Sequence, residues 1–360
     1  MLNGNAKHMI FVTGGTGLVG SHLLLSLVSK FGRVRALKRK SSDIEQVRKL
    51  FSWYRGDAGA LFDLIEWVDG DILDIYSLEP LLEGVETVYH CAAVVSFDSR
   101  KRSEMIHYNV EGTAHMVDAA LACGVKRICH VSSNSALGSS RNGTPVTEET
   151  SWVPSRKNTG YSESKFFSEA EIWRGMEEGL GAVVVNPSII VGPGKWGSGS
   201  TSFFPAIDRG LRFYPGGTTG YVDVRDVVDA IMLLTSDENF AQARGRRYLV
   251  SAENISYRDF FGAVADALGK PRPAFRATTL MLEGAWRASA LLSLLTGRSP
   301  LVSRETAASG RKETCYDGSA ITRLFGFSYR PISEAIQNTA ACYLRDIRAS
   351  SVTSGKPAGE

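Results

Sequence analysis

The sequence contains little that would support a disulfide framework or a metal centre. Its five cysteines are odd in number and form no CxxC or Cys/His spacing; they are Cys91, Cys123, Cys129, Cys315 and Cys342. Such a set predicts neither paired disulfides nor a zinc site, and no metal is expected. A reducing, cytoplasmic location fits these cysteines best.

An excess of one charge and a long hydrophobic run are also missing. The formal net charge is only +3, and basic residues gather only at 35–40 and 99–102, so no nucleic-acid partner is expected. The N-terminal apolar run is too short for a signal peptide. The most apolar later stretch, 280–297, is interrupted by Glu283 and Arg287 and is shorter than the roughly 20 residues that span a bilayer. We therefore expect no integral membrane span, and a buried or lid helix that could face a lipophilic substrate.

What the sequence does contain is a regular alternation of short β-branched runs with longer amphipathic runs. It begins at "MIFVTGG" and "SHLLLSLVSKFG" and continues through "ETVYHCAAV" and "KRICHVSS" to "GAVVVNPSIIVGPG". This βαβα rhythm is typical of a parallel, doubly wound sheet. The predicted fold class is therefore α/β, with a Rossmann-type sheet and a smaller, mostly helical C-terminal substrate domain.

The pattern changes after residue 191, which suggests how the chain is divided. Residues 192–220 are loop-rich with one short helix near 201–209, residues 221–237 suggest a return to the main sheet and a helix, and the pattern from 251 is mostly helical. We expect a discontinuous Rossmann domain at 8–191 and 218–250, and a substrate domain at 192–217 and 251–346. Residues 347–360 are expected to be a disordered tail.

A glycine-rich turn lies directly between the first predicted strand and the first predicted helix. Gly14, Gly17 and Gly20 in "TGGTGLVG" would permit a tight turn, close approach of a pyrophosphate and close packing of helix on strand. The helix N-terminus would add amide donors and a positive dipole end. In this position the motif predicts dinucleotide binding, whereas the same glycines alone would be compatible with a plain tight turn.

A second motif, "YSESK", places a tyrosine and a lysine four residues apart at the start of a predicted helix. Tyr161 and Lys165 differ by about 40° in azimuth, so they share one helix face. A free tyrosine has a pKa of about 10, and a nearby ammonium with an oxidised nicotinamide would lower it. The pair is then a proton donor with its supporting cation, although the spacing also arises by chance.

Together "TGGTGLVG" and "YSESK" resemble the short-chain dehydrogenase/reductase superfamily in its extended branch, the NAD-dependent epimerase/dehydratase family. Supporting segments follow in order: "GDILD" (70–74), "VYHCAA" (88–93), "NVEGT" (109–113), "VSSNSALG" (131–138) and "NPSIIVGPG" (186–194). Residues 93–113 and the apolar C-terminal stretch look similar to dihydroflavonol-reductase-like and 3β-hydroxysteroid-dehydrogenase-like members.

The resemblance implies a set of site residues. Counting back five positions from Gly138 gives Ser133 as the catalytic hydroxyl, preferred over Ser132, beside Tyr161 and Lys165. Asn109 would either brace the active site or simply pack its helix. The implied dinucleotide contacts are Gly14, Thr16, Gly17, Leu18, Val19, Asp71, Ile72, Ala92, Ala93, Ser132, Tyr161, Lys165, Pro187 and Ser188. Many relatives carry an arginine before the proline of "NPSIIVGPG", where this sequence has Asn186.

The end of the second predicted strand bears on which dinucleotide is bound. An acidic residue there would accept hydrogen bonds from the ribose of NAD, but this strand ends in Lys38, Arg39, Lys40 and Ser41. Arg39 and Lys40 would attract a 2′-phosphate, which favours NADP(H) and leaves NAD(H) possible. The alternative is a solvated basic strand end.

The predicted activity is NADP(H)-dependent reduction of a ketone or aldehyde, or oxidation of the alcohol, on a bulky, partly apolar small molecule. One alternative is a nucleotide-sugar epimerase or dehydratase with tightly bound NAD, since fold alone does not separate the two. Another is a non-catalytic dinucleotide-sensing protein, against which the intact Ser133, Tyr161 and Lys165 argue. The resemblance also implies a homodimer.

Overall fold

The computed structural model describes residues 9–139, 143–155, 158–296 and 304–353. Its centre is a seven-stranded sheet in the order β10-β6-β5-β4-β1-β2-β3, and all of its neighbouring strands pair in parallel. The strands are β1 (Met9–Thr13), β2 (Val34–Lys38), β3 (Ile65–Asp69), β4 (Val85–His90), β5 (Arg127–Val131), β6 (Gly181–Pro187) and β10 (Arg246–Val250). The strand order reverses between β1 and β4, where open α/β sheets bind ligands at the carboxyl ends of their strands. The predicted Rossmann-type fold is confirmed.

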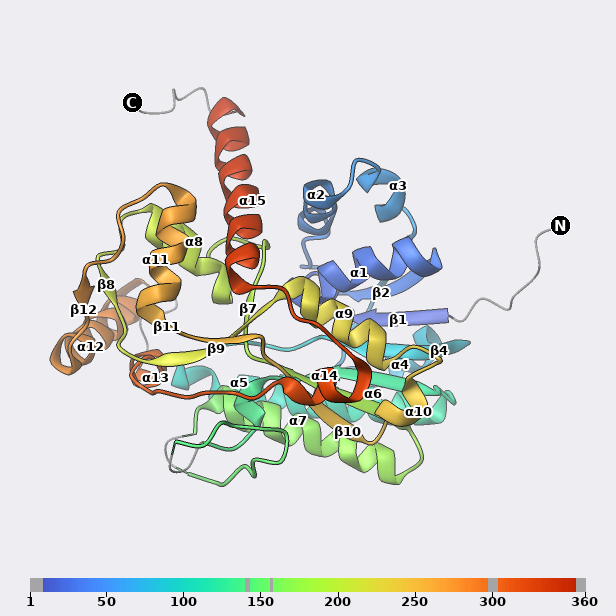
Figure 1. Cartoon of the computed structure of the whole chain (residues 1–360). Coiled ribbons are helices and arrows are strands. Elements are labelled where there is room, and N and C mark those ends of the chain that lie inside the picture. Colours follow the sequence, from blue (N-terminus) through green and yellow to red (C-terminus); the bar gives the residue numbers. More distant parts are fainter. Residues whose placement is uncertain (1–8, 140–142, 156–157, 297–303, 354–360) are drawn as a thin grey trace.

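Helices cover both faces of this sheet (Figure 1). One face packs against α1 (Leu18–Phe31), α2 (Glu45–Tyr54), α3 (Ala58–Phe62) and α9 (Val224–Leu234). The other packs against α4 (Ile75–Leu82), α6 (Gly112–Ala122) and α7 (Gly160–Glu177). Because central parallel strands are buried on both faces, they read as continuous apolar runs, as in the fully buried Val183–Val185 of β6.

The remaining elements form a smaller layer beside the sheet. It contains a three-stranded sheet of β7 (Ile189–Val191), β9 (Thr218–Asp223) and β11 (Glu253–Ser256), and a two-stranded one of β8 (Phe213–Tyr214) and β12 (Phe275–Arg276). Its helices are α8 (Phe203–Asp208), α11 (Tyr257–Leu268), α12 (Thr279–Thr296), α13 (Arg304–Ser309) and α15 (Ile332–Thr353). The helix α14 (Ser319–Phe325) packs instead against β10 of the main sheet. Phe204, Phe260 and Ile336 belong to its own apolar core.

Short elements complete the described chain. They are the 3₁₀ turns η1 (Ser99–Lys101), η3 (Asn134–Ala136) and η4 (Gly199–Ser202), the helices α5 (Arg102–Ile106) and α10 (Phe240–Ala243), and the π-helical segment η2 (His107–Glu111). The last lies between α5 and α6, and single π-helical turns of this kind often occur near functional sites.

Two predictions about organisation are wrong. Residues 221–223 belong to β9, which pairs with β7 and β11, so the chain returns to the main sheet through α9 and β10 instead. Residues 347–353 are the end of α15 rather than a disordered tail, and 354–360 lie outside the described residues. Apart from residues 347–353, which belong to α15, we propose the same division into a Rossmann domain and a substrate domain as the sequence suggests. Residue 8 also lies outside the described range.

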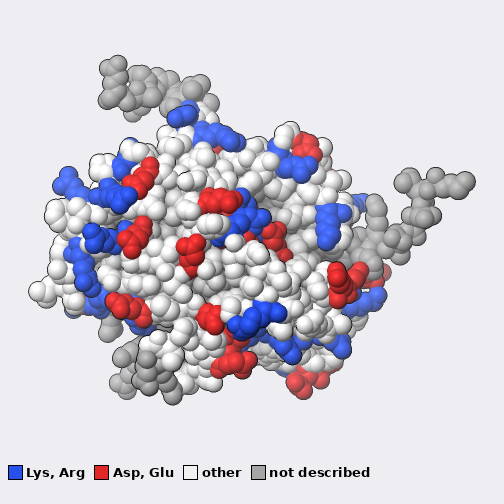
Figure 2. All heavy atoms as spheres, viewed as in Figure 1, with Lys and Arg blue, Asp and Glu red and all other residues white. Residues whose placement is uncertain are grey.

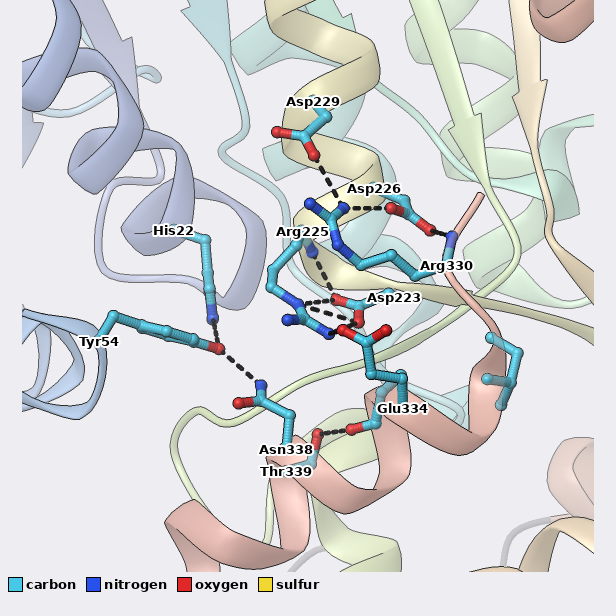
Figure 3. A network of polar contacts seen from close by, with 12 residues as sticks. His22, Tyr54, Asp223, Arg225, Asp226, Asp229, Arg330, Glu334, Asn338 and Thr339 are labelled. Atoms are coloured by element: carbon cyan, nitrogen blue, oxygen red, sulfur yellow. Dashed lines mark hydrogen bonds and ion pairs between the residues drawn. The ribbon is translucent and has the colours of Figure 1, made fainter. Parts of the chain in front are cut away.

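A polar network joins α15 to the helices over the main sheet (Figure 3). His22 of α1 and Asn338 of α15 both contact the hydroxyl of Tyr54, at 3.2 and 3.1 Å. Arg225 of α9 forms an ion pair with Asp223 at 2.5 Å and with Glu334 of α15 at 3.0 Å. The C-terminal helix is thus tied to the helix that follows the glycine turn.

The surface carries both charges intermixed, and Figure 2 shows no uniformly basic region on the face it displays. Within the described ranges, no helix combines the length and apolarity that a membrane crossing requires.

Candidate active site

The glycine turn has the backbone geometry that its residues predict. Gly14 has a φ of +67°, and a Cβ there would lie 2.5 Å from the backbone nitrogen of Ala92. A Cβ on Gly20 would lie 2.2 Å from the carbonyl oxygen of Gly14. Gly17 caps the N-terminus of α1 and is exposed, so its backbone faces outward. The three glycines therefore serve the tight turn, the packing of α1 and an open approach for an anion.

The neighbours of this turn divide into accessible and enclosed groups. Thr16 and Leu18 are half-buried, whereas the side chain of Val19 is only 8% exposed and packs in the core, so any contact from Val19 comes from its backbone. Ala92 and Ala93 follow β4 beside the turn and are half-buried, with the Ala92 amide donating to the Thr13 hydroxyl at 3.2 Å. All of these lie at the carboxyl ends of β1 and β4.

The basic end of β2 is only partly free. Lys38 is paired with Asp69 at the end of β3, 2.5 Å from its carboxylate, so its charge is compensated. Arg39 lies over the ring of Tyr108 at 5.2 Å, and Lys40 is exposed. Burial raises the pKa of Tyr108, while Arg39 lowers it and Asp71 raises it further, which places these three side chains near one another. Tyr108 was not singled out from the sequence.

Asp71 and Ile72 differ in what they offer to a ligand. Asp71 is half-buried, and its carboxylate accepts from the Leu73 amide at 3.1 Å. The side chain of Ile72 is 1% exposed and lies against Gly112, and its carbonyl is 3.2 Å from the ring of His115. The side chain of Ile72 therefore cannot reach an adenine, and only its amide remains available.

The two candidate serines point to different surroundings. Ser133 lies close enough to Tyr161 to oppose the rise in the pKa of Tyr161 that burial causes, and its hydroxyl donates to the side-chain oxygen of Asn134 at 3.2 Å. The hydroxyl and amide of Ser135 donate to the Ser133 oxygen at 2.9 and 3.2 Å. The Ser132 hydroxyl is buried without a partner among the described residues. Of the two serines, Ser133 is therefore the one that acts on Tyr161.

Burial sets the state of Tyr161 in the protein without its cofactor. It raises the pKa of the phenol, and the Lys165 ammonium is directed at the Val131 carbonyl, 2.9 Å away; the lowering expected from an ammonium together with an oxidised nicotinamide stays a prediction. The phenol is therefore fully protonated at neutral pH, which is the form that can donate a proton.

Lys165 is deeply buried at the centre of the site. Its side chain is 3% exposed, and burial lowers its pKa to about 8, against the opposing influence of Glu169 and Cys91. Tyr161 and Lys165 share one face of α7, as their spacing predicts.

Asn109 connects the loop after β4 with the helix that carries Tyr161. Its side chain accepts from the Val94 amide at 2.7 Å and donates to the Val94 carbonyl at 2.9 Å and to Ser164 at 3.0 Å. Its own carbonyl accepts from Ser168 at 2.8 Å. Of the two roles expected for Asn109, these contacts support the bracing one.

Pro187 and Ser188 lie at the end of β6, at the same edge of the sheet. The Ser188 amide donates to the Val250 carbonyl at 3.0 Å, and its side chain is 5% exposed. A Cβ on Gly220 would meet that of Ser188 at 3.1 Å, so β9 closes over this position.

Two residues near the site were not predicted from the sequence. The ring of Phe97 makes an edge contact with Tyr161 at 5.9 Å between centroids and remains 39% exposed. Glu169 is 1% exposed, one turn beyond Lys165. Glu169 could have been recognised from its position four residues after Lys165, which continues the spacing of Tyr161 and Lys165. Nothing in the sequence indicates the contact made by Phe97.

Comparison with known proteins agrees with this arrangement. Residues 10–250 match the model of the NAD dependent epimerase/dehydratase family. A protein of Synechocystis sp. named as a candidate dihydroflavonol 4-reductase is 31% identical over 91% of this chain and 92% of its own length. Sterol demethylase protein B of Methylococcus capsulatus is 33% identical over 76% of this chain and 78% of its own length. The crystal structure of gox2253 superimposes with a TM-score of 0.75 at 30% identity, covering 95% of this chain and 99% of that one.

The chain therefore belongs to the NAD dependent epimerase/dehydratase family, which confirms the resemblance drawn from its motifs. The glycine turn fits the dinucleotide that the family name implies, since side chains at Gly14 and Gly20 would collide with neighbouring backbone and Gly17 leaves α1 open to a phosphate.

Proposed function

We propose that this protein is an NADP(H)-dependent oxidoreductase that reduces a ketone or aldehyde, or oxidises the corresponding alcohol, on a bulky, partly apolar small molecule. The observation that carries the proposal is the convergence of three side chains at the carboxyl edge of the sheet. Ser133 lies near Tyr161 and acts on its pKa, and the buried Lys165 lies one turn along the same helix as Tyr161.

The residues of this chain would divide the reaction between them. A reduced dinucleotide whose pyrophosphate is held at the glycine turn would supply a hydride, with its two electrons, to the carbonyl carbon. Tyr161 gives its phenolic proton to the carbonyl oxygen, so that C=O becomes CH–OH and the charge balances. Ser133 donates a hydrogen bond to the same oxygen, and Lys165 stabilises the phenolate that remains. Gly17, Thr16 and Leu18 would hold the pyrophosphate, and Asp71 the adenine.

An apolar substrate is supported by the side chains around Tyr161. Val95 and Phe97, on the loop after β4, are 55% and 39% exposed, and Phe97 contacts Tyr161. Leu280 and Met281 at the start of α12 are also exposed; the side chains of α12 beyond 287 are outside the described residues. The names of the relatives, which include a sterol-modifying protein and a candidate dihydroflavonol reductase, point to substrates of similar character.

The preference for NADP(H) is supported by the end of β2. With Lys38 neutralised by Asp69, Arg39 and Lys40 remain to meet a 2′-phosphate, and the stacking of Arg39 on Tyr108 orients its guanidinium.

The test is to screen ketones and aldehydes for NADPH consumption and to compare the wild type with Tyr161→Phe. The variant should lose turnover while keeping its affinity for NADPH, because the ring stays and only the proton donor is removed. A variant that still turns over would refute the mechanism. Tightly retained NAD(H) with no net turnover of free NADPH in the wild type would favour an epimerase or dehydratase instead.

A further inference from the structure

The catalytic face of α7 continues past Lys165 to a buried acid. Tyr161, Lys165 and Glu169 follow one another at intervals of four residues, which places them in one row along the helix. Glu169 is 1% exposed, a rare environment for a carboxylate unless it is paired and hydrogen-bonded.

The partners of Glu169 come from two strands. The amide nitrogen of Asn186 on β6 donates to one carboxylate oxygen at 2.5 Å, and the Arg247 guanidinium on β10 lies 3.5 Å from the other. The same amide nitrogen of Asn186 donates to the Ser133 carbonyl at 3.0 Å. Asn186 therefore connects the helix that carries Lys165 to the strand end that carries Ser133.

The ionic state of Glu169 depends on these partners. Burial raises its pKa, whereas Ser132, Asn186 and Arg247 lower it. Ser132 contributes by proximity, since its hydroxyl makes no hydrogen bond of normal geometry with any described residue. The amide donor and the guanidinium thus favour the ionised form of Glu169 and oppose the effect of burial.

Among the described groups that act electrostatically on Lys165, Glu169 is the one carboxyl group, and it raises the pKa of Lys165. His90 of β4 and His130 of β5 face Lys165 but are neutral, since burial lowers the pKa of His90 to about 3 and that of His130 well below its usual range. Burial raises the pKa of the Cys91 thiol to about 12, so it stays uncharged. Tyr161 stays protonated on the same side.

We propose that Glu169 is a positioning residue that keeps the buried Lys165 protonated and, through Asn186, fixes the strand end that carries Ser133. The proposal rests on the role of Lys165 in the proposed function. It also accounts for Asn186, where many relatives carry an arginine: here the positive partner of the acid comes from Arg247 on the neighbouring strand, and Asn186 supplies the hydrogen bonds.

The test measures dinucleotide affinity, which does not require turnover. NADPH dissociation constants are determined from pH 6 to 10 for the wild type, Glu169→Gln, Lys165→Met as the reference without an ammonium, and Glu171→Gln as the control. Glu171 lies on the same helix but pairs with Arg174 at the surface. Wild-type affinity should fall as the pH rises through the Lys165 pKa of about 8, because the ammonium is lost above it.

In Glu169→Gln this fall should begin about one pH unit lower, so that binding at pH 8 weakens several-fold relative to pH 6, whereas Glu171→Gln should match the wild type. Lys165→Met should remove the pH dependence. Superimposable curves for Glu169→Gln and the wild type, or a curve unchanged in Lys165→Met, would overturn the proposal.

Circular dichroism checks whether Glu169→Gln folds, and a second variant tests the proposal if it does not. Arg247→Met removes a partner whose side chain is 21% exposed, and should shift the curve in the same direction by a smaller amount, because Glu169 then ionises less readily. No shift would count against the proposal. If the shifts occur while no carbonyl compound is reduced, the proposed activity fails and the role of Glu169 stands.

Discussion

At the scale of single residues, adjacent serines provide a matched test of the site. Ser133 lies near Tyr161 and opposes the rise in its pKa, whereas the Ser132 hydroxyl has no hydrogen-bond partner in the described chain. Ser133→Ala should lower kcat by about 100-fold or more, because one donor to the developing oxyanion is removed. Ser132→Ala should retain most activity. Equal losses in the two variants, measured under saturating NADPH, would contradict the assignment of Ser133.

The basic residues after β2 allow a test of cofactor choice. Arg39→Ala combined with Lys40→Ala should raise the KM for NADPH far more than that for NADH, since only NADPH carries the 2′-phosphate. Lys38→Ala is the control: Lys38 is already paired with Asp69, so its loss should not distinguish the two cofactors. Steady-state kinetics with both cofactors measures this, and parallel increases would exclude a 2′-phosphate contact.

The sequence predicts most residues of the site but not their orientation. Gly14 could be identified because its φ of +67° and its contact with Ala92 leave room for no other residue. Tyr161 and Lys165 were found because helix geometry fixes their common face. The rise that burial causes in the pKa of Tyr161 has no local sequence signal, since it depends on packing by distant segments, and the direction of the Lys165 ammonium is likewise set by the carbonyl of Val131 on another strand.

At the scale of elements, the hydroxyl of Tyr54 on α2 links α15 to α1. The His22 ring nitrogen Nδ1 is 2.8 Å from the Leu18 carbonyl and must donate to it, so Nε2 accepts from the Tyr54 hydroxyl, which in turn accepts from Asn338 (Figure 3). The Tyr54 hydroxyl therefore donates to one partner and accepts from the other, and its removal leaves Nε2 of the buried His22 without a hydrogen-bond partner.

Tyr54→Phe should lower the free energy of unfolding by roughly 1–3 kcal/mol, because Nε2 of His22 and the amide of Asn338 lose their partner. Thermal denaturation measures the change as a fall in Tm of several degrees. Tyr76→Phe is the matched control, since Tyr76 is 87% exposed on α4. A loss of stability in both variants alike would show that this network does not join the elements as described.

The two errors about elements share a physical cause. The run at 221–223 has the composition of a main-sheet strand, but its pairing with β7 and β11 is decided by long-range contacts. The polar end of α15 reads as a tail, yet the helix is anchored just before it by Asp346, which accepts from the indoles of Trp53 and Trp196 at 3.1 and 2.7 Å. Such contacts between distant segments leave no local pattern.

At the scale of the whole molecule, three buried histidines determine how the protein responds to acid. Burial lowers the pKa of His22 to about 4, that of His90 to about 3, and that of His130 well below its ordinary value. The unfolded chain binds these protons near pH 6.5, whereas the folded protein does not. The stability that comes from neutral histidines is therefore complete above pH 6.5 and is lost as the pH falls from there toward 4.

Between about pH 6 and 4 the unfolded state binds up to three more protons than the native state at these sites, so they alone should reduce the free energy of unfolding by about 4 kcal/mol per pH unit. Urea denaturation at a series of pH values measures this slope. His22→Gln should reduce it by about a third, because one titrating group is removed. His107→Gln should leave it unchanged, since that ring is exposed and pairs with Glu111 at the surface. If His22→Gln gives the same slope as His107→Gln and the wild type, the neutral, buried state of His22 does not control acid stability.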